Sequence, residues 1–292
     1  VRLVPARRTQ LDRALPGGLD RKGAAAGRRA ARAVLSERAG DGLGGRDARP
    51  EVRLPAPRPG IWRPVPPFPP PAETQVATAR PFLLSSPSQL RPGPPPGLGS
   101  VTFRRDLAEV RLLGERDSSA RTPEQTEVAR FWAGSELDIQ VRLLRQALRA
   151  QPLPTGKAVQ LLSVYFRVGT DAEVAVFDAK YAYLFWRPIT AIGSPTWVPL
   201  LVTPGHPEYP SAHTVYAAAA AGVLEHFFGA APAKPLVVEV GGVRRTFRSW
   251  QQAVRENEDA RVWSGIHFRS SDDAGSALGR AVAAYGLSQV DR

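Results

Sequence analysis

Residues 203–228, TPGHPEYPSAHTVYAAAAAGVLEHFF, carry the clearest structural signal in the chain. The first eight of them include three prolines, which restrict the backbone and predict a stiff loop. Ser211 follows, a residue type that often caps helix N-termini, and residues 212–228 are almost continuously apolar. The stretch therefore predicts a rigid loop that leads directly into an apolar helix.

Helical patterns also lie on both sides of this stretch. Thr122-Pro123-Glu124-Gln125 is a clear helix start, with Thr as N-cap, Pro in the first turn and Gln as capping-box partner. Thr170 is expected to cap a new helix that ends before Pro188. The predicted helices span residues 106–113, 122–132, 137–150, 155–168, 171–186, 212–228, 249–262 and 273–287, and a small hairpin spans 237–247. This pattern predicts an all-α fold class, with a helical bundle as the domain over residues 101–292.

The first 100 residues differ in composition from the rest. Residues 1–60 hold 14 Arg or Lys against 6 Asp or Glu, with no lasting apolar period, and are expected to form a basic, disordered tail. Such a tail can bind nucleic acid, but a tail without such a role is the favoured interpretation. Residues 61–100 are rich in proline and are expected to be extended, with interspersed apolar side chains holding them along the folded body.

Two absences narrow the possible functions. The chain has no Cys, which excludes disulfides, zinc–thiolate sites and Cys nucleophiles. No run of about 18 apolar residues occurs, so no membrane-spanning helix is predicted. The net charge of +12 comes mostly from the basic tail, and the rest of the chain is only mildly basic.

Lys180 and Arg187 are the first candidate functional residues. They lie seven residues apart on one predicted helix, about two turns, and so project from nearly the same face. The residues between them are almost all apolar or aromatic. Two cations in such surroundings either reach solvent or converge on a bound anion.

The loop before the apolar helix supplies the second candidate group. A helix N-terminus offers free backbone N–H groups and the positive end of the helix dipole, which together bind anions. Ser211 adds a hydroxyl, and His213 in the first turn can exchange a proton near neutral pH. The alternative is a capping Ser with a structural His.

The third candidate group is the segment RVWSGIH, residues 261–267, with Asp272 shortly after it. Arg261 can bind a tetrahedral oxyanion through two N–H groups. A neutral His267 can attack phosphorus or coordinate an oxometalate. A carboxylate behind the imidazole would select its tautomer, and Asp272 is the candidate for that role, with a helix N-cap as the alternative. Of the other histidines, His206 is a candidate for the pocket mouth and His226 is interpreted as structural.

These three groups together resemble the superfamily of vanadium-dependent haloperoxidases and type 2 phosphatidic acid phosphatases. Its pattern is Lys, six residues, Arg-Pro; then Pro-Ser-Gly-His; then Ser-Arg, five residues, His, three residues, Asp. The chain matches it at residues 180–188, 210–213 and 261–267, and the resemblance is closest to the soluble haloperoxidase-like branch. The resemblance implies that residues 101–292 form a catalytic domain with the helical bundle that the apolar periodicity already predicts.

The resemblance implies a role for each matching residue. Lys180, Arg187, Ser211, the amide of Ala212 and Arg261 would bind the oxygens of vanadate or phosphate. His213 would be the general acid or base. His267 would coordinate vanadium or bond covalently to phosphorus.

Three positions depart from the family pattern. Ala212 replaces Gly, Ala260 replaces Ser, and Ser271 stands where the pattern has the Asp, with Asp272 one residue later. On a regular helix that shift rotates the carboxylate by about 100°. The departures leave the orienting role of Asp272 open.

Three functions remain as hypotheses. One is a haloperoxidase-like enzyme that holds vanadate and oxidises halide with hydrogen peroxide. Another is an acid phosphatase that needs no cofactor and hydrolyses phosphate esters through a phosphohistidine at His267. The third is a degenerate, non-catalytic interaction protein. The resemblance also favours small-molecule substrates, a periplasmic or secreted location and a possible homo-oligomer.

Overall fold

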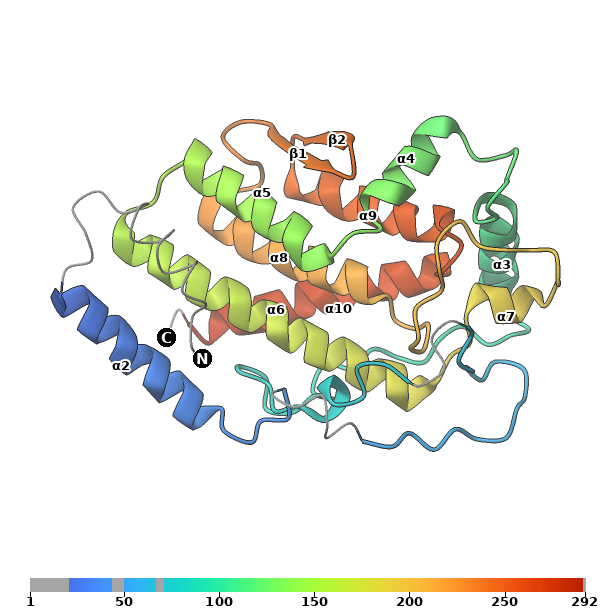
Figure 1. Ribbon diagram of the computed structural model, residues 1–292, viewed down its shortest axis with the longest axis horizontal. Helices are drawn as coiled ribbons and strands as arrows, with labels where there is room; N and C mark the ends of the chain where they lie inside the picture. The colour runs from blue at the N-terminus through green and yellow to red at the C-terminus, as the bar shows by residue number, and fades with distance from the viewer. Residues whose placement is uncertain (1–20, 44–49, 67–70, 291–292) are drawn as a thin grey trace. The chain divides into compact units, whose positions relative to one another are not determined.

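The computed structural model describes residues 21–43, 50–66 and 71–290 (Figure 1). The chain divides between residues 44 and 45 into two compact units. The first contains helix α2 (Arg21–Glu37), so the expectation that residues 1–60 lack regular structure is wrong for this stretch. Alanine and arginine dominate α2, and their high intrinsic helix propensity outweighs the missing apolar period. Residues 1–20 and 44–49 of the predicted tail lie outside the described residues.

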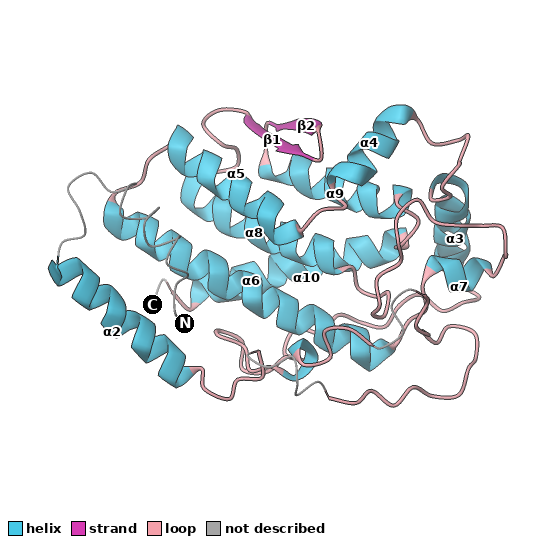
Figure 2. Cartoon of the chain, in the orientation of Figure 1, coloured by secondary structure: helices cyan, strands magenta, loops and turns pink. Residues whose placement is uncertain are grey.

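The regular secondary structure of the second unit is almost entirely helical, which confirms the predicted all-α fold class (Figure 2). Its helices are α3 (Val101–Leu113), α4 (Pro123–Phe131), α5 (Glu136–Ala150), α6 (Thr155–Tyr183), α7 (Pro188–Ile192), α8 (Ala212–Phe228), α9 (Trp250–Trp263) and α10 (Arg269–Ser288). A 3-10 turn, η2 (Val76–Thr78), precedes them, and an antiparallel hairpin of β1 (Leu236–Val240) and β2 (Val243–Phe247) lies between α8 and α9. In the described part of the chain, no helix is long and apolar enough to cross a membrane.

Helix α8 is the central element of the bundle and packs against α5, α6, α9 and α10 (Figure 1). Its run of five alanines, residues 217–221, is buried and keeps the neighbouring helices close. Gly279 of α10 faces this run so closely that an added Cβ would lie 2.2 Å from the carbonyl oxygen of Val215. Small residues on both helices therefore set the α8–α10 distance.

Helix α6 departs from the sequence prediction, because it is one continuous helix of 29 residues. Thr170 does not cap a new helix: its hydroxyl donates to the carbonyl of Phe166, 2.8 Å away, inside the same helix. Helix α6 ends at Tyr183, where Leu184 adopts a left-handed conformation with φ of 50°. Lys180 is thus in the last turn of α6, whereas Arg187 lies beyond it as the N-cap of α7. The expectation that the two cations share one helix is wrong.

The Pro-rich segment lies along the bundle, as its apolar residues predict. The carboxylate of Asp171 in α6 accepts backbone N–H groups of Phe82, Leu83 and Leu84 at 2.5–2.8 Å. Further along, Arg91 forms an ion pair with Asp178 of the same helix at 2.7 Å. These bonds hold the segment against the C-terminal half of α6, which leads into the candidate site.

Candidate active site

The candidate site lies where four helix ends meet. Lys180 comes from the end of α6, Arg187 from the start of α7, Ser211 from the start of α8 and Arg261 from the end of α9. His267 lies in the short connection between α9 and α10. The structure therefore brings together the three groups that the sequence places far apart.

Lys180 holds the loop that precedes α8. Its ammonium group donates to the carbonyl oxygens of Pro207 and Glu208, each 2.9 Å away. The backbone N–H of Glu208 in turn donates to the carbonyl of Phe185 at 2.9 Å. These bonds join the end of α6 to the loop and set the position at which α8 begins.

Arg187 connects this loop to His267. Its Nε donates to the carbonyl of His206 at 3.0 Å, and its Nη1 donates to the carbonyl of Ile266 at 2.8 Å. The same Nη1 lies 3.1 Å from Nε2 of His267. Arg187 thereby fixes the two segments that carry the candidate histidines relative to each other.

Three cations are buried in the site. Lys180, Arg187 and Arg261 are at most 3% exposed. Burial lowers the pKa of Lys180 well below its usual range and those of Arg187 and Arg261 to about 10, and Arg187 further lowers that of Lys180. Because buried cations are costly without anions, this cluster favours a negatively charged ligand.

Buried carboxyl groups only partly compensate these cations. Burial raises the pKa of Glu208 to about 7 and that of Glu136 to about 8, and it raises the pKa of Asp272 well above its usual range. Arg187 acts against burial at Glu208, and Gln140 does so at Glu136. Burial thus favours the neutral form of these carboxyl groups, whereas Arg187 and Arg261, with pKa values of about 10, keep their positive charge near neutral pH.

Several side-chain polar atoms at the site are buried and have no hydrogen-bond partner among the described residues. They include Oγ of Ser211, Nε2 of His213 and Nε of Arg261, and also Oε2 of Glu208 and both carboxylate oxygens of Asp272. Ser211 and His213 flank the first residue of α8, Ala212, whose N–H has no acceptor within the helix. Arg261 is close enough to His213 to lower the pKa of its ring, after the larger effect of burial. Unpaired buried groups are rare and costly, so this set fits an absent polar ligand.

A vanadate or phosphate ion fits these residues. The hydroxyl of Ser211, the guanidinium of Arg261 and the amide of Ala212 are donors, which an oxyanion requires. Together with the buried cations they offer the hydrogen-bond donors and the positive charge that an oxyanion requires.

The carboxylate that contacts His267 is Glu208, not Asp272. Oε1 of Glu208 lies 2.8 Å from Nδ1 of His267 and accepts the backbone N–H of Phe268 at 2.9 Å. Asp272 lies near Ser211 instead: burial raises the pKa of Asp272, and the Ser211 side chain lowers it to a lesser degree. Neither of the carboxylate oxygens of Asp272 has a hydrogen-bond partner within normal geometry among the described residues. Asp272 is also not the N-cap of α10, a position held by Phe268.

The difference has a physical cause. Residues 269–288 form a regular helix, so Asp272 is rotated by about 100° from the position of Ser271, where the family pattern has its carboxylate. The sequence contained one signal for Glu208, an acidic residue three positions before Ser211 in a loop that is otherwise largely apolar and proline-rich.

The remaining histidines differ in their relation to the site. His206 is part of it, since its Nδ1 lies 3.1 Å from Nη2 of Arg187 and its ring contacts Phe177 edge-on. His226 is exposed in the last turn of α8, with its ring against Phe227. This position agrees with the expectation that His226 has no role at the site.

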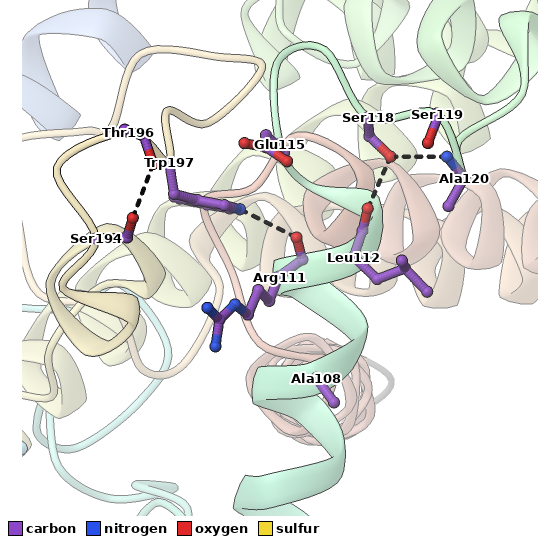
Figure 3. Close-up of a pocket in the computed structure, with 10 residues that line it drawn as sticks. All are labelled: Ala108, Arg111, Leu112, Glu115, Ser118, Ser119, Ala120, Ser194, Thr196 and Trp197. Atoms are coloured by element: carbon purple, nitrogen blue, oxygen red, sulfur yellow. Dashed lines mark hydrogen bonds between the residues drawn. The ribbon is translucent and has the colours of Figure 1, made fainter.

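A separate surface pocket of about 600 Å³ lies beside the C-terminal end of α3 (Figure 3). Its rim includes Arg111, Ser118 and Trp197. Trp197 Nε1 donates to the carbonyl of Arg111 at 3.0 Å, and the Ser118 hydroxyl donates to the carbonyl of Leu112 at 2.7 Å (Figure 3). None of the sequence-predicted site residues lines this pocket.

The described residues contain no group of three or more His, Asp or Glu placed to hold a metal ion.

Comparisons with known proteins show what the chain is similar to. A family model described as the second helical-bundle domain of VCPO matches residues 192–292, which include Ser211, His213, Arg261 and His267 but not Lys180 or Arg187. A bacterial vanadium-dependent iodoperoxidase has a similar structure, with a TM-score of 0.72 and 28% identity over 79% of this chain. The chain spans 60% of the length of that iodoperoxidase. A search of curated proteins gives no match.

Bacterial vanadium-dependent chloroperoxidase has the same fold in its holo and apo forms. The TM-scores are 0.74 and 0.76, with 16% identity in both cases. The similarity covers 98% and 99% of this chain and 78% and 80% of the chloroperoxidase chains. The chloroperoxidase likeness shows a shared fold, and the family model and the similarity to the iodoperoxidase support the vanadium haloperoxidase superfamily for this chain.

Proposed function

We propose that the chain is a vanadate-dependent haloperoxidase-like enzyme, which oxidises a halide with hydrogen peroxide. The observation that carries the proposal is the set of buried, unpartnered polar atoms of Ser211, His213 and Arg261 beside His267. The structural similarity to vanadium-dependent iodoperoxidase and chloroperoxidase supports vanadate rather than phosphate as the resident ion.

The chain would hold the vanadate oxygens with Lys180, Arg187, Ser211, Arg261 and the amide of Ala212. Nε2 of His267 would be the ligand to vanadium. Bound vanadate supplies a Lewis-acidic centre that activates hydrogen peroxide toward nucleophilic attack by halide. The buried cations stabilise negative charge on the oxygens, and they do so without reorganisation because the protein already holds them in place.

His213 would transfer the proton that peroxide releases on binding. Burial, and to a lesser degree Arg261, lower the pKa of His213 well below its usual range, so the imidazole is neutral at working pH. Its Nε2 is buried and unpartnered. A neutral imidazole has a free lone pair to accept a proton, and a bound anion would offset the cations that lower its basicity.

Paired assays test the proposal. The metal-free protein is given peroxide, iodide or bromide and a phenolic dye, with and without vanadate, and hydrolysis of a generic phosphate ester is measured in parallel. We expect halogenation of the dye only with vanadate. Ester hydrolysis without halogenation would make the protein a phosphatase that uses the same residues. Absence of activity in both assays would indicate a non-catalytic protein.

His267→Ala provides the site test, with His226→Ala as its matched control. We expect the first change to abolish vanadate-dependent halogenation, because it removes the proposed vanadium ligand. The second removes an exposed imidazole and should keep wild-type activity. Activity that survives His267→Ala would refute the site assignment.

A further inference from the structure

We infer that Glu208 is a positioning residue that fixes the tautomer of His267, so that Nε2 keeps its lone pair for the anion site. The inference rests on the proposed function only where it concerns vanadate. The tautomer itself is a property of the ligand-free protein and can be measured there.

The first argument concerns the Nδ1 side of the ring. Oε1 of Glu208 lies 2.8 Å from Nδ1 of His267 and 2.9 Å from the backbone nitrogen of Phe268. A backbone N–H can only donate, so Oε1 acts as an acceptor in this arrangement. An ionised carboxylate has no hydrogen to donate, so when Glu208 is ionised the short contact with Nδ1 requires that Nδ1 carries the proton.

The second argument concerns the opposite side of the ring. Nε2 of His267 lies 3.1 Å from Nη1 of Arg187. A guanidinium can only donate, so Nε2 must be unprotonated. The contacts with Glu208 and with Arg187 therefore demand the same tautomer, with hydrogen on Nδ1 and the lone pair on Nε2.

The third argument is that Glu208 is held rigidly. Its carbonyl oxygen accepts the Lys180 ammonium at 2.9 Å, its N–H donates to Phe185 at 2.9 Å, and its side chain is fully buried. These bonds anchor the Glu208 backbone, and the Phe268 N–H holds Oε1 of the carboxylate, so this oxygen is placed to orient the imidazole. It acts from the loop that also leads to Ser211, whereas the family pattern places its carboxylate after the His.

Glu208 should also affect anion binding. An acceptor on the distal nitrogen of a ligating imidazole sets the ring orientation and raises the basicity of the other nitrogen. Loss of such a partner typically weakens metal binding by about 10–100-fold.

The experiment is nitrogen-15 NMR of histidine-labelled, ligand-free protein at pH 7.5. The chain has only four histidines, and His267→Gln identifies the signals of His267. We expect the Nδ1–H tautomer in the wild-type protein, with a strongly deshielded Nδ1 proton. A wild-type ring protonated on Nε2 would overturn the inference without any variant.

Two variants distinguish the effect of the acceptor oxygen of Glu208 from the effect of its negative charge. Glu208→Gln keeps an acceptor oxygen at the position of Oε1 and should keep the tautomer. Glu208→Ala removes the acceptor and should give averaged nitrogen shifts and lose the deshielded proton. The inference fails if Glu208→Ala keeps the tautomer, since Arg187 alone would then determine it, or if Glu208→Gln loses it.

Glu256→Ala is the matched control, because Glu256 also accepts an aromatic N–H, that of Trp132 at 3.1 Å, away from His267. It should leave the His267 signals unchanged.

Calorimetric titration with vanadate tests the consequence for anion binding, which should be about 10–100-fold weaker in Glu208→Ala than in the wild-type protein. If wild-type protein binds no vanadate, the proposed function fails while the tautomer result stands. If both proteins bind vanadate equally, only the positioning role fails.

Discussion

Ser211 illustrates the energetic cost of a buried hydroxyl that has no hydrogen-bond partner among the described residues. The residue occupies the N-cap position of α8, yet its side chain makes no capping hydrogen bond, and Oγ is buried without a partner among the described residues. An unsatisfied buried hydroxyl costs about 1–3 kcal/mol. Such a cost is typical of a functional site, where the missing bond forms only with the ligand.

This argument predicts opposite effects of Ser211→Ala on stability and on binding. The ligand-free variant should unfold in urea with a free energy equal to the wild-type value or higher by up to ~1 kcal/mol, because the orphaned hydroxyl is gone. Its affinity for vanadate should fall about tenfold, which corresponds to one lost hydrogen bond. A variant that is less stable than wild type and binds vanadate normally would show that Ser211 is an ordinary structural residue.

The residue scale is also where sequence and structure differ most. Lys180, Arg187, Ser211, Arg261 and His267 follow a spacing pattern, so the sequence alone could nominate them. The partner of His267 could not be nominated, because Glu208 is 59 residues away along the chain. Their contact depends on the loop position that Lys180 determines.

At the scale of elements, the contact between α8 and α10 positions the start of α8. An added Cβ on Gly275 of α10 would lie 2.1 Å from Oγ1 of Thr214 and 2.7 Å from the carbonyl oxygen of Ser211. The Thr214 side chain can rotate away, but the Ser211 backbone belongs to the site. The backbone N–H of Ser211 also donates to the carbonyl of Ser271 at 3.1 Å, so α10 and the site loop form one packed unit.

Gly275→Ala should therefore impair both stability and anion binding. We expect overpacking to lower the free energy of unfolding by roughly 1–3 kcal/mol, with weaker vanadate binding because Ser211 is displaced. Gly156→Ala is the matched control, since Gly156 lies in the first turn of α6 with no atom within 4 Å of an added Cβ. The control should be neutral or stabilise by about 0.4–1 kcal/mol. Equal effects of the two changes in urea unfolding would contradict the packing argument.

Element boundaries were predictable where the signal is local. The capping box of Thr122 and Gln125 marks the start of α4, and both of its hydrogen bonds are present in the structure. The predicted break at Thr170 is wrong, because a Thr inside a helix can bond to the carbonyl four residues earlier and looks the same in sequence as a cap. Tertiary packing of α6 against α8 decides between the two.

At the scale of the whole molecule, buried carboxyl groups make stability depend on pH. Glu136, at the start of α5, is 8% exposed and accepts the side-chain amides of Gln140 and Asn257. Burial raises its pKa from 4.5 to about 8. The folded protein therefore keeps this proton up to about pH 8, while the unfolded chain releases it near pH 4.5. The contribution of Glu136 to the free energy of unfolding is therefore fully present below its pKa in the unfolded chain, and it is lost as pH rises through its pKa in the folded protein.

Glu136→Gln should remove this pH dependence. As pH rises from 5 to 8, the unfolding free energy of the wild-type protein should fall, relative to that of the variant, by on the order of 3 kcal/mol. Urea unfolding at several pH values measures the difference. Glu127→Gln, on an exposed position of α4, is the control and should keep the wild-type slope. A Glu136→Gln protein with the wild-type slope would show that Glu136 is ionised in the folded state.

The sequence by itself determined the helical class and most helix starts, and it identified the residues that we propose to bind an oxyanion. These follow from apolar periodicity, caps and fixed spacings, which are local properties of the chain. Only the tertiary structure decided that α6 is continuous, that Arg187 lies beyond its end and that Glu208 rather than Asp272 meets His267. Each of these depends on contacts between segments distant in sequence, and the energies of such contacts are set by packing and burial, which local sequence does not specify.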